Sequence, residues 1–585
     1  MLLAALGADG GRRARDVIER VSDSSGPPRA VINHLSGAVA SWGPHAAVNK
    51  RWIAEGCGDF GADGFSPSTL KQVRGDFALF GLEQGAVLLA TGCAGGYRPV
   101  YVASPSRELV VACTHLAPLL ALLPQRPAID VEYLSASILR RAPKLPESTL
   151  YVGINRLPMG ESWLVQPGIQ PQRRSTVVPL MERELVDDGD LAVRLRFAIA
   201  EATRRSARNA SRLAVEVSGG LDSSMLLSLL VSLARTGELS APPEAITYES
   251  VIPTAHDDGP HLRSLEDHIE VRAHRVMPKD AAAMVSQLMV VDAMPARSPT
   301  LSAAKAIGTV ARSCGVDVVL TGDGGDEILD GHPRLFGELA RRGQILRAID
   351  GAFRTRGAYF QDHVQRVAGF LLTMLDPLLP TSGLLALRRW RQRPPRWTGA
   401  ALARHAHLLI APPEPQATLC ETPGERYARL LRWNAFGPWS IVRLQEELVG
   451  GYTLRSPLLD DEFLRFAATL PPLSLMQGGF RRGLMREAMR GLVPEDLRLR
   501  ETKGTSYFFI EQTLALAGGL DALIGLADVR MLADLGLVEP RPFREFFESF
   551  RGTSEDDANY ADLWLILSAE AFLRQHAGES LLRSQ

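Results

Sequence analysis

Residues Val215 to Ser224, with the sequence VEVSGGLDSS, decide how the centre of this chain is built. Apolar residues lead into two glycines, and an apolar run from Met225 follows, so we expect a strand, a glycine loop and a buried helix. Such a loop presents free backbone N–H groups and the positive end of a helix to an anion. Gly219 and Gly220 let the backbone approach a phosphate closely. Asp222 beside a phosphate calls for Mg²⁺ between the two groups.

A second segment, VVLTGDGGDE from Val318 to Glu327, has the same layout of a strand followed by a glycine-rich turn. Asp326 in this turn is placed to supply a second carboxylate to a magnesium ion, opposite Asp222. Taken alone, the turn is equally typical of a calcium-binding loop or of a plain surface loop. Its position after a strand, together with the first loop, favours a shared nucleotide and metal site.

Working outward from these loops, the pattern predicts two domains. Residues 1–180 contain short apolar runs separated by turns, which favour an antiparallel, sheet-rich layer. A polar, turn-prone stretch over 177–190 is interpreted as a linker, and a helix is expected over 191–208. From 191 to 585, strands alternate with helices around a parallel sheet, and a helical insertion is expected at about 335–445.

Composition narrows the class of protein. The chain has 585 residues, 46% of them hydrophobic, and a net charge of −1, so it has no global field that would attract nucleic acid. Its cysteines are scattered without metal-ligand spacing, which is typical of reduced thiols in a cytoplasmic protein. The most apolar stretch, 370–387, is broken by Asp376, Pro377 and Pro380, so we expect no membrane span.

The SGGLDSS loop resembles the pyrophosphate loop, SGGxDS, of the N-type ATP pyrophosphatases. Together with the GDGGDE turn and the segments 454–460, 484–490 and 500–504, it makes the chain similar to the asparagine synthetase superfamily over most of its length. The resemblance implies a degenerate glutaminase-like domain of Ntn-hydrolase type, an α+β sandwich, followed by an α/β ATP pyrophosphatase domain. It also implies ATP and Mg²⁺ as cofactors.

Site residues follow from the same resemblance. Mg²⁺ is expected on Asp222 and Asp326, and Lys503 falls where the family has its catalytic lysine. This chain contains only six lysines among its 65 basic residues, so a retained lysine is informative. The residues expected to bind the nucleotide are Ser218, Gly219, Gly220, Leu221, Asp222, Ser223, Ser224 and Gly322.

The chain departs from asparagine synthetase in its N-terminal part. Where an active glutaminase of this type has a cysteine after the initiator methionine, this chain has Leu2, so the first domain is expected to make no ammonia. β-Lactam synthetases, carbapenam synthetases and lasso peptide cyclases also lack that cysteine and take the amine from the substrate. β-Lactam synthetases have a tyrosine where this chain has Asp323. The GDGGD turn, the segment RSPLLD from Arg455 to Asp460 and the long helical insertion make the chain most similar to the lasso peptide cyclases, which are macrolactam synthetases.

That resemblance implies adenylation of an Asp or Glu side chain in a linear core peptide, followed by attack of the N-terminal amine to form an isopeptide ring. Asp323 is then a candidate to orient or deprotonate the amine. Expected partners are a leader peptidase and a leader-binding recognition protein, with no nucleic acid. The basic run Arg388 to Trp397 is interpreted either as a solvated face or as a contact for the peptide.

Three other readings stay open at this point. The first is β-lactam synthetase-like closure of a small amino acid, and the second is an ammonia-dependent asparagine synthetase. A pseudoenzyme scaffold is the third, but it would be expected to lose the metal aspartates or the lysine. Enzymes of tRNA thiolation share the loop, yet they need a basic surface or catalytic cysteines near it, and the sequence shows neither.

Overall fold

The structure is a computed structural model of the chain. It describes residues 1–7, 12–33, 37–42, 46–49, 51–56, 70, 73, 75–83, 85–92, 98–141, 145–176, 190–249, 258–331, 334–354, 395–406, 422–436, 438–501, 507–550 and 557–578. Several sequence predictions fall outside these residues. They are the linker apart from Asp190, the catalytic lysine Lys503, the parts of the helical insertion at 355–394 and 407–421, and the basic run up to Pro394.

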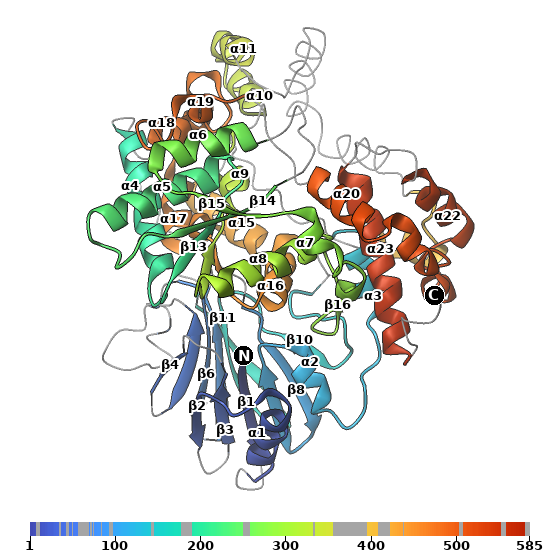
Figure 1. Cartoon of the computed structure of the whole chain (residues 1–585). Helices are drawn as coiled ribbons and strands as arrows, with labels where there is room; N and C mark the ends of the chain where they lie inside the picture. The colour runs from blue at the N-terminus through green and yellow to red at the C-terminus, as the bar shows by residue number, and fades with distance from the viewer. Residues whose placement is uncertain are drawn as a thin grey trace.

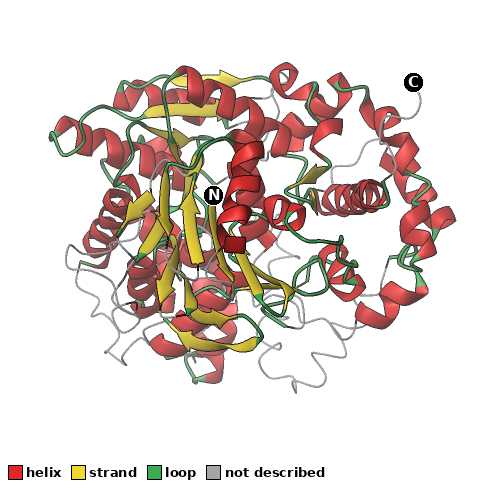
Figure 2. Cartoon of the chain, turned by 90° about the horizontal axis from the view of Figure 1, so that it is seen from below, coloured by secondary structure: helices red, strands yellow, loops and turns green. Residues whose placement is uncertain are grey.

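Two antiparallel sheets form the N-terminal part of the described chain (Figures 1 and 2). The strand order is β10-β8-β9-β1-β3-β2 in one sheet and β12-β11-β7-β6-β5-β4 in the other. The strands are β1 (Leu2–Gly7), β2 (Ala30–Asn33), β3 (Gly37–Ser41), β4 (Ala46–Val48), β5 (Trp52–Gly56), β6 (Phe77–Glu83), β7 (Ala86–Thr91), β8 (Tyr101–Ser106), β9 (Leu109–Cys113), β10 (Ile154–Arg156), β11 (Glu161–Gln166) and β12 (Ile169–Ser175). The sheet-rich layer expected here is confirmed.

Strand β1 is buried on both faces, and its side chains point alternately into two different hydrophobic cores. Leu2, Ala4 and Leu6 pack between the two sheets, whereas Leu3 and Ala5 face the opposite side. That opposite side is covered by α1 (Arg12–Ser25) and is continuous with a core that includes α23 (Asp557–His576) near the end of the chain. The N-terminal sheet that contains β1 and the C-terminal helices therefore share one hydrophobic core.

A five-stranded parallel sheet lies above the sandwich in Figure 1, in the order β15-β14-β13-β18-β19. Its strands are β13 (Leu213–Glu216), β14 (Glu244–Tyr248), β15 (Ala273–Val276), β18 (Val318–Leu320) and β19 (Thr453–Arg455), and each neighbouring pair is parallel. The predicted strand–loop–helix units are confirmed: β13 leads into α5 (Leu221–Arg235), and α4 (Leu191–Ala207) occupies the expected helix.

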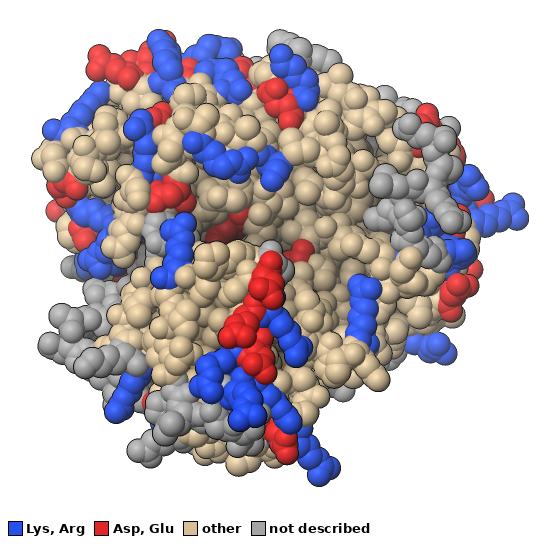
Figure 3. Space-filling view, turned by 60° about the horizontal axis from the view of Figure 1, so that its bottom comes forward, with Lys and Arg blue, Asp and Glu red and all other residues tan. Residues whose placement is uncertain are grey.

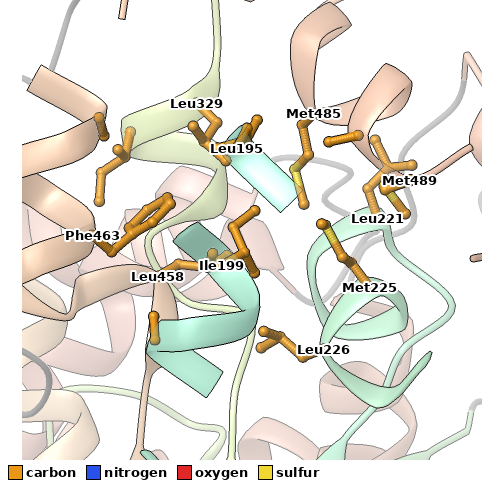
Figure 4. Close-up of a cluster of buried hydrophobic side chains, with 14 of the residues drawn as sticks. Leu195, Ile199, Leu221, Met225, Leu226, Leu329, Leu458, Phe463, Met485 and Met489 are labelled. Atoms are coloured by element: carbon orange, nitrogen blue, oxygen red, sulfur yellow. The ribbon is translucent and has the colours of Figure 1, made fainter. Parts of the chain in front are cut away.

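Helices cover both faces of this sheet, as a parallel sheet requires. Leu213 and Val215 of β13 face the core formed by α4, α5 and α6 (Gly259–Ile269), while Ala214 faces the core beneath α8 (Leu301–Ser313). Figure 4 shows the first of these cores, in which Ile199, Met225 and Phe463 lie close together. This packing fixes β13 and α5, and with them the loop that joins the two.

The remaining described elements are mostly short helices. They are α2 (Leu116–Ala121), α3 (Val131–Ile138), α7 (Pro278–Ala282), η2 (Ser286–Leu288), β16 (Val290–Val291), β17 (Met294–Pro295), α9 (Gly325–Leu329), α10 (Arg334–Arg341), α11 (Ile345–Arg354), α14 (Ala400–Ala406), α15 (Pro423–Phe436), α16 (Pro438–Gly450), η4 (Pro457–Leu459), α17 (Asp461–Thr469), η5 (Pro472–Gly479), α18 (Gly483–Ala488), α19 (Glu495–Arg498), α20 (Tyr507–Leu516), η6 (Gly519–Leu526), α21 (Arg530–Asp534) and α22 (Pro540–Ser549). Most of the described residues between 335 and 445 are helical, and the bounds of the predicted insertion stay a prediction.

The surface charge and the hydropathy of the helices can be described for part of the chain. Basic and acidic side chains are interspersed on the face shown in Figure 3. Among the described residues, no helix is both long enough and apolar enough to span a membrane.

Candidate active site

The SGGLDSS loop lies at the carboxyl end of β13 and opens α5. Gly219 has a φ of +84°, and a Cβ atom there would lie 2.7 Å from the carbonyl oxygen of Asp258. Only glycine fits this position, because both the backbone angle and the space exclude a side chain. Gly237, at φ +78°, has no atom within 4 Å of such a Cβ, so a positive φ alone does not bring the backbone into such close contact.

Hydrogen bonds within the loop hold its backbone in place. The Ser218 side chain accepts a bond from the N–H of Gly220 at 3.2 Å, and the N–H of Ser218 bonds the Ser223 hydroxyl at 3.3 Å. Leu221, Ser223 and Ser224 are buried, whereas Ser218 is exposed. Of the three serines expected to bind the nucleotide, Ser218 is therefore the one that this conformation presents to solvent.

The second predicted loop packs directly against the first. Strands β13 and β18 are parallel neighbours, so their carboxyl ends meet at one edge of the sheet. A Cβ atom on Gly322 would lie 2.8 Å from Cβ of Asp222, and one on Gly325 would collide with the Asp222 carboxylate. The two glycines thus allow the GDGGDE turn to approach Asp222, as the hypothesis of a shared site requires.

Asp222 and Asp326 converge on one cationic group, the guanidinium of Arg482. Arg482 bonds the Asp222 carboxylate at 2.6 Å and lies 3.2 Å from that of Asp326, with a side chain only 11% exposed. Burial lowers the pKa of Arg482, but the carboxylates of Asp222 and Asp326 outweigh burial and raise it overall. Two carboxylates that already surround one cation are a donor set that fits Mg²⁺.

Asp323 lies on the same turn and faces helix α16. Its Oδ2 accepts a bond from the Thr321 hydroxyl at 2.8 Å and lies 3.2 Å from Nε of Arg443. The Asp323 side chain is 44% exposed, whereas that of Arg443 is 6% exposed. Asp323 therefore presents a carboxylate to solvent from a position that a buried arginine fixes.

Two further carboxyl groups, Glu216 and Glu446, share this environment and were missed by sequence reasoning. Burial and the charges of Glu446 and Asp323 raise the pKa of Glu216 to about 8. Burial and Asp323 raise the pKa of Glu446 to about 7, although its bond from the Thr300 hydroxyl, at 3.0 Å, works in the other direction. Carboxyl groups with pKa values near neutrality suit general acid–base chemistry.

Arg500 connects the C-terminal part of the chain to the glycine loop. Its side chain is 4% exposed, bonds the carbonyl oxygen of Gly219 at 2.7 Å and pairs with Asp258. Because Asp258 also borders Gly219, Arg500 fixes both sides of the loop. Lys503 lies outside the described residues, so its role stays a prediction.

A loop of the N-terminal part contacts the helix that carries Glu446. Arg98 lies 3.4 Å from Asp76 and bonds Glu447 of α16 at 3.2 Å. Glu447 in turn accepts a bond from the N–H of Leu454 at 3.1 Å. Burial raises the pKa of Asp76 to about 7, while Arg98 opposes that rise. The sandwich thus supports one wall of the candidate site.

Comparison with known proteins identifies the class of enzyme. A protein-family model matches residues 194–574, which contain both glycine loops, Arg482 and Glu446. The match makes the chain an ATP-dependent amide-bond-forming ligase. The family is described as asparagine synthase, and the chain belongs to it.

Other comparisons add little. No curated protein matches the chain. Among solved structures, 31 chains match. One is glutamine phosphoribosylpyrophosphate amidotransferase from B. subtilis, complexed with ADP and GMP. It shares 8% identity, covers 55% of this chain and 75% of that one, and has a TM-score of 0.18, a likeness too weak to carry an argument.

Proposed function

We propose that this enzyme closes the macrolactam ring of a lasso peptide. In this proposal the side chain of an Asp or Glu in a linear core peptide is adenylated, and the N-terminal amine of the same peptide then attacks it. The observation that carries the proposal is the group of carboxyl side chains, Asp323, Glu446 and Glu216, beside the glycine loop. They supply both a place to orient an amine and a base to deprotonate it.

The first step is formation of an acyl-adenylate. A carboxylate oxygen of the peptide attacks the α-phosphorus of ATP, and the bond to the β-phosphate breaks to release pyrophosphate. The N–H groups of the loop around Gly219 and Gly220 bind the phosphates. Asp222 and Asp326 would hold Mg²⁺, which neutralises phosphate charge when bound. Arg482 then exchanges its carboxylate partners for phosphate oxygens, for which a guanidinium is well suited.

The second step is amide formation. The peptide's amine attacks the activated carbonyl, the isopeptide bond forms, and AMP leaves. Asp323, held by Arg443 and Thr321, accepts a hydrogen bond from the amine and orients it. Glu446 takes the proton that the amine must lose, because its pKa of about 7 lets it serve as a base near neutral pH. Lys503 is proposed to stabilise the charge of the adenylate and of the tetrahedral intermediate.

Leu2, the first residue of β1, supports the proposal. Leu2 is fully buried in the core between the sheets, and its N–H bonds the Thr114 hydroxyl at 3.0 Å. A buried leucine has no nucleophile, so we propose that the N-terminal part releases no ammonia from glutamine and that the amine comes from the substrate. We place the reaction in the cytoplasm, with a leader peptidase and a leader-binding protein as partners that supply the peptide.

Ring closure itself requires little free energy. Closing a loop of about eight residues costs on the order of 2 kcal/mol of chain entropy, far less than ATP cleavage provides. Placing the tail of the peptide inside the ring before closure is the harder requirement. We propose that the helical portion, which includes α10, α11 and α15, helps to enclose the prefolded peptide.

The test uses the full chain with MgATP and linear, leader-free peptides encoded beside its gene, and it measures pyrophosphate release and peptide mass. We expect peptide-dependent pyrophosphate and loss of one water from the peptide. A peptide with its acceptor Asp or Glu changed to the amide should release no pyrophosphate. An N-acetylated peptide should release pyrophosphate without forming a ring.

Two results would reject the proposal in favour of another branch of the family. Turnover only with a small β-amino acid would indicate closure of a β-lactam. Turnover only with aspartate and ammonium would indicate an asparagine synthetase that uses free ammonia. The Asp222→Asn variant controls for contaminating ATPases in each assay, because it removes a predicted metal ligand.

A further inference from the structure

A second cluster of side chains lies at the amino end of the parallel sheet, away from the glycine loops. Glu244 begins β14, His274 is the second residue of β15, and Cys314 follows the last residue of α8. The glycine loops, in contrast, follow the last residues of β13 and β18. The cluster therefore plays no part in the chemistry proposed above.

The three side chains come together through the register of the sheet. His274 pairs with Ile246, and Glu244 precedes Ile246 by two residues, so both polar side chains lie on the same face of neighbouring parallel strands. Helix α8 covers that face and contacts both strands, which brings Cys314 at its end toward them. The fold itself positions a thiol, an imidazole and a carboxylate at one place.

The distances fit a shared metal ion. Nε2 of His274 lies 3.1 Å from Oε2 of Glu244 and 3.6 Å from Sγ of Cys314, and the three ligand atoms all lie within 4.8 Å of one another. In a tetrahedral zinc site, bonds of about 2.0–2.1 Å to nitrogen and oxygen and about 2.3 Å to sulfur separate the ligand atoms by roughly 3.3–3.6 Å. The two distances from the histidine nitrogen are close to that range.

The same geometry argues against a catalytic triad of cysteine, histidine and acid. In a triad, one ring nitrogen of the histidine faces the nucleophile and the other faces the acid. Here Cys314 and Glu244 both approach the same nitrogen, Nε2 of His274. Three ligand atoms within 4.8 Å of one another fit a shared ion better than they fit such a triad.

One oxygen of Glu244 remains available to a metal ion although the other is paired. Arg212 pairs with Oε1 of Glu244, so Oε2 is the oxygen that faces His274. The side chains of Glu244 and His274 are 20% and 43% exposed, and Cys314 is partly buried, which leaves solvent access for an ion and for a water as fourth ligand.

We propose that Glu244, His274 and Cys314 bind a zinc ion, with water as the fourth ligand. A thiolate, an imidazole and a carboxylate are the ligand types that select zinc over magnesium or calcium. The ion would connect β14, β15 and the end of α8, and so stabilise the amino end of the parallel sheet. The candidate active site lies at the opposite, carboxyl end of the same sheet.

The test is zinc titration of the chelator-treated, full-length protein against a chromophoric zinc indicator. We expect one tight equivalent in the wild type, at least about 100-fold weaker binding in Cys314→Ser and in His274→Ala, and an intermediate loss in Glu244→Gln. His268→Ala, which removes an exposed histidine of α6, is the matched control and should bind zinc normally. Cobalt in place of zinc should give a thiolate charge-transfer band that Cys314→Ser abolishes.

A readout of stability separates this site from adventitious binding. Zinc should raise the midpoint of thermal unfolding of the wild type and of Asp222→Asn, but not of Cys314→Ser. The proposal is overturned if the wild type binds no tight equivalent. It is equally overturned if Cys314→Ser and His274→Ala both keep that equivalent while Asp222→Asn loses it, because zinc would then occupy the aspartates of the active site.

Discussion

Buried carboxyl groups at the centre and at the edge of the parallel sheet have pKa values that are shifted in opposite directions. At the edge, Glu266 of α6 has a side chain only 2% exposed and accepts two bonds from Arg275, at 3.1 and 2.9 Å, and one from the N–H of Ala273 at 2.7 Å. Burial would raise the pKa of Glu266, but Arg275 and this N–H overcome it and the pKa is lowered. Glu266 is a charged group whose partners compensate for burial.

At the centre, Glu216 and Glu446 lie among other carboxylates, and their pKa values rise to about 8 and about 7. Burial is the largest cause in both cases, as it is for Glu266, so burial alone does not separate the two regions. The difference lies in the neighbours. Arg275 compensates for the burial of Glu266, whereas the like charge of Asp323 acts on both Glu216 and Glu446, and Arg443 offsets it at Glu446 only in part. A structural carboxylate thus differs from a candidate catalytic one in whether a positive charge compensates for its burial, and not in how deeply it is buried.

The largest effect is expected when a carboxylate is removed from the centre. Asp222→Asn should lower peptide-dependent pyrophosphate release by about 10³-fold, because it removes a predicted metal ligand beside the phosphates. Asp267→Asn, an exposed aspartate of α6, is the control and should leave the rate unchanged. Equal rates for Asp222→Asn and wild type would mean that the glycine loops are not the nucleotide site.

Glu446→Gln should separate the two chemical steps. We expect ring closure to fall by about 10²-fold or more, while pyrophosphate exchange from the adenylation step persists. In the wild type, the rate of ring closure should rise with pH through about 7, the pKa of Glu446, since a base acts only when deprotonated.

The neighbouring Glu447 provides the matched control for Glu446. It bonds Arg98 and the N–H of Leu454, so Glu447→Gln should affect packing and leave the pH profile in place. If Glu447→Gln removed the pH dependence and Glu446→Gln did not, the assignment of the base would be wrong.

The sequence predicts the glycine loops at the centre of the sheet and the main features of the fold. The SGGLDSS and GDGGDE segments could be predicted to meet because each is a local strand-to-turn motif and because metal chemistry requires two carboxylates. Gly322 and Gly325 are in those motifs, and the structure shows what they permit, the close approach to Asp222. The parallel sheet, its helices and the antiparallel layer could also be predicted, because the hydrophobic period changes along the chain.

Residues contributed by distant helices could not be predicted. Arg482 and Arg500 reach the loops from more than 200 positions away, in a chain so rich in arginine that the residue type alone carries no signal. Glu446 and Arg443 lie on an amphipathic helix whose sequence resembles any other such helix. Only tertiary packing brings them beside Asp323, so no local pattern marks them.

At the edge, the main effect of a substitution should be on stability. Glu266→Gln should lower the free energy of unfolding by about 2 kcal/mol, because Arg275 would lose one of its two carboxylate partners and keep Glu249 at 2.9 Å. Urea unfolding at neutral pH measures this, and Glu270→Gln, whose side chain is 83% exposed, should change it by less than about 0.5 kcal/mol. Adenylation and ring closure should be unaffected in both variants, and a loss of either step in Glu266→Gln alone would weaken the distinction between edge and centre.

The most diagnostic effect is expected from Glu216→Gln. In the wild type, the folded-state pKa of Glu216 is about 8 against an ordinary 4.5, so its contribution to stability is present below pH 4.5 and is lost as pH rises toward 8. An uncharged glutamine removes that loss, so the variant should gain stability relative to the wild type as pH rises from 4.5 toward 8, with little difference near pH 4.5. Glu266→Gln should behave in the opposite sense, since its lowered pKa stabilises the fold above pH 4.5 and that stabilisation is lost only in acid. Unfolding curves of the two variants across this pH range therefore test the comparison directly, and parallel curves would show that Glu216 is compensated in the folded protein just as Glu266 is.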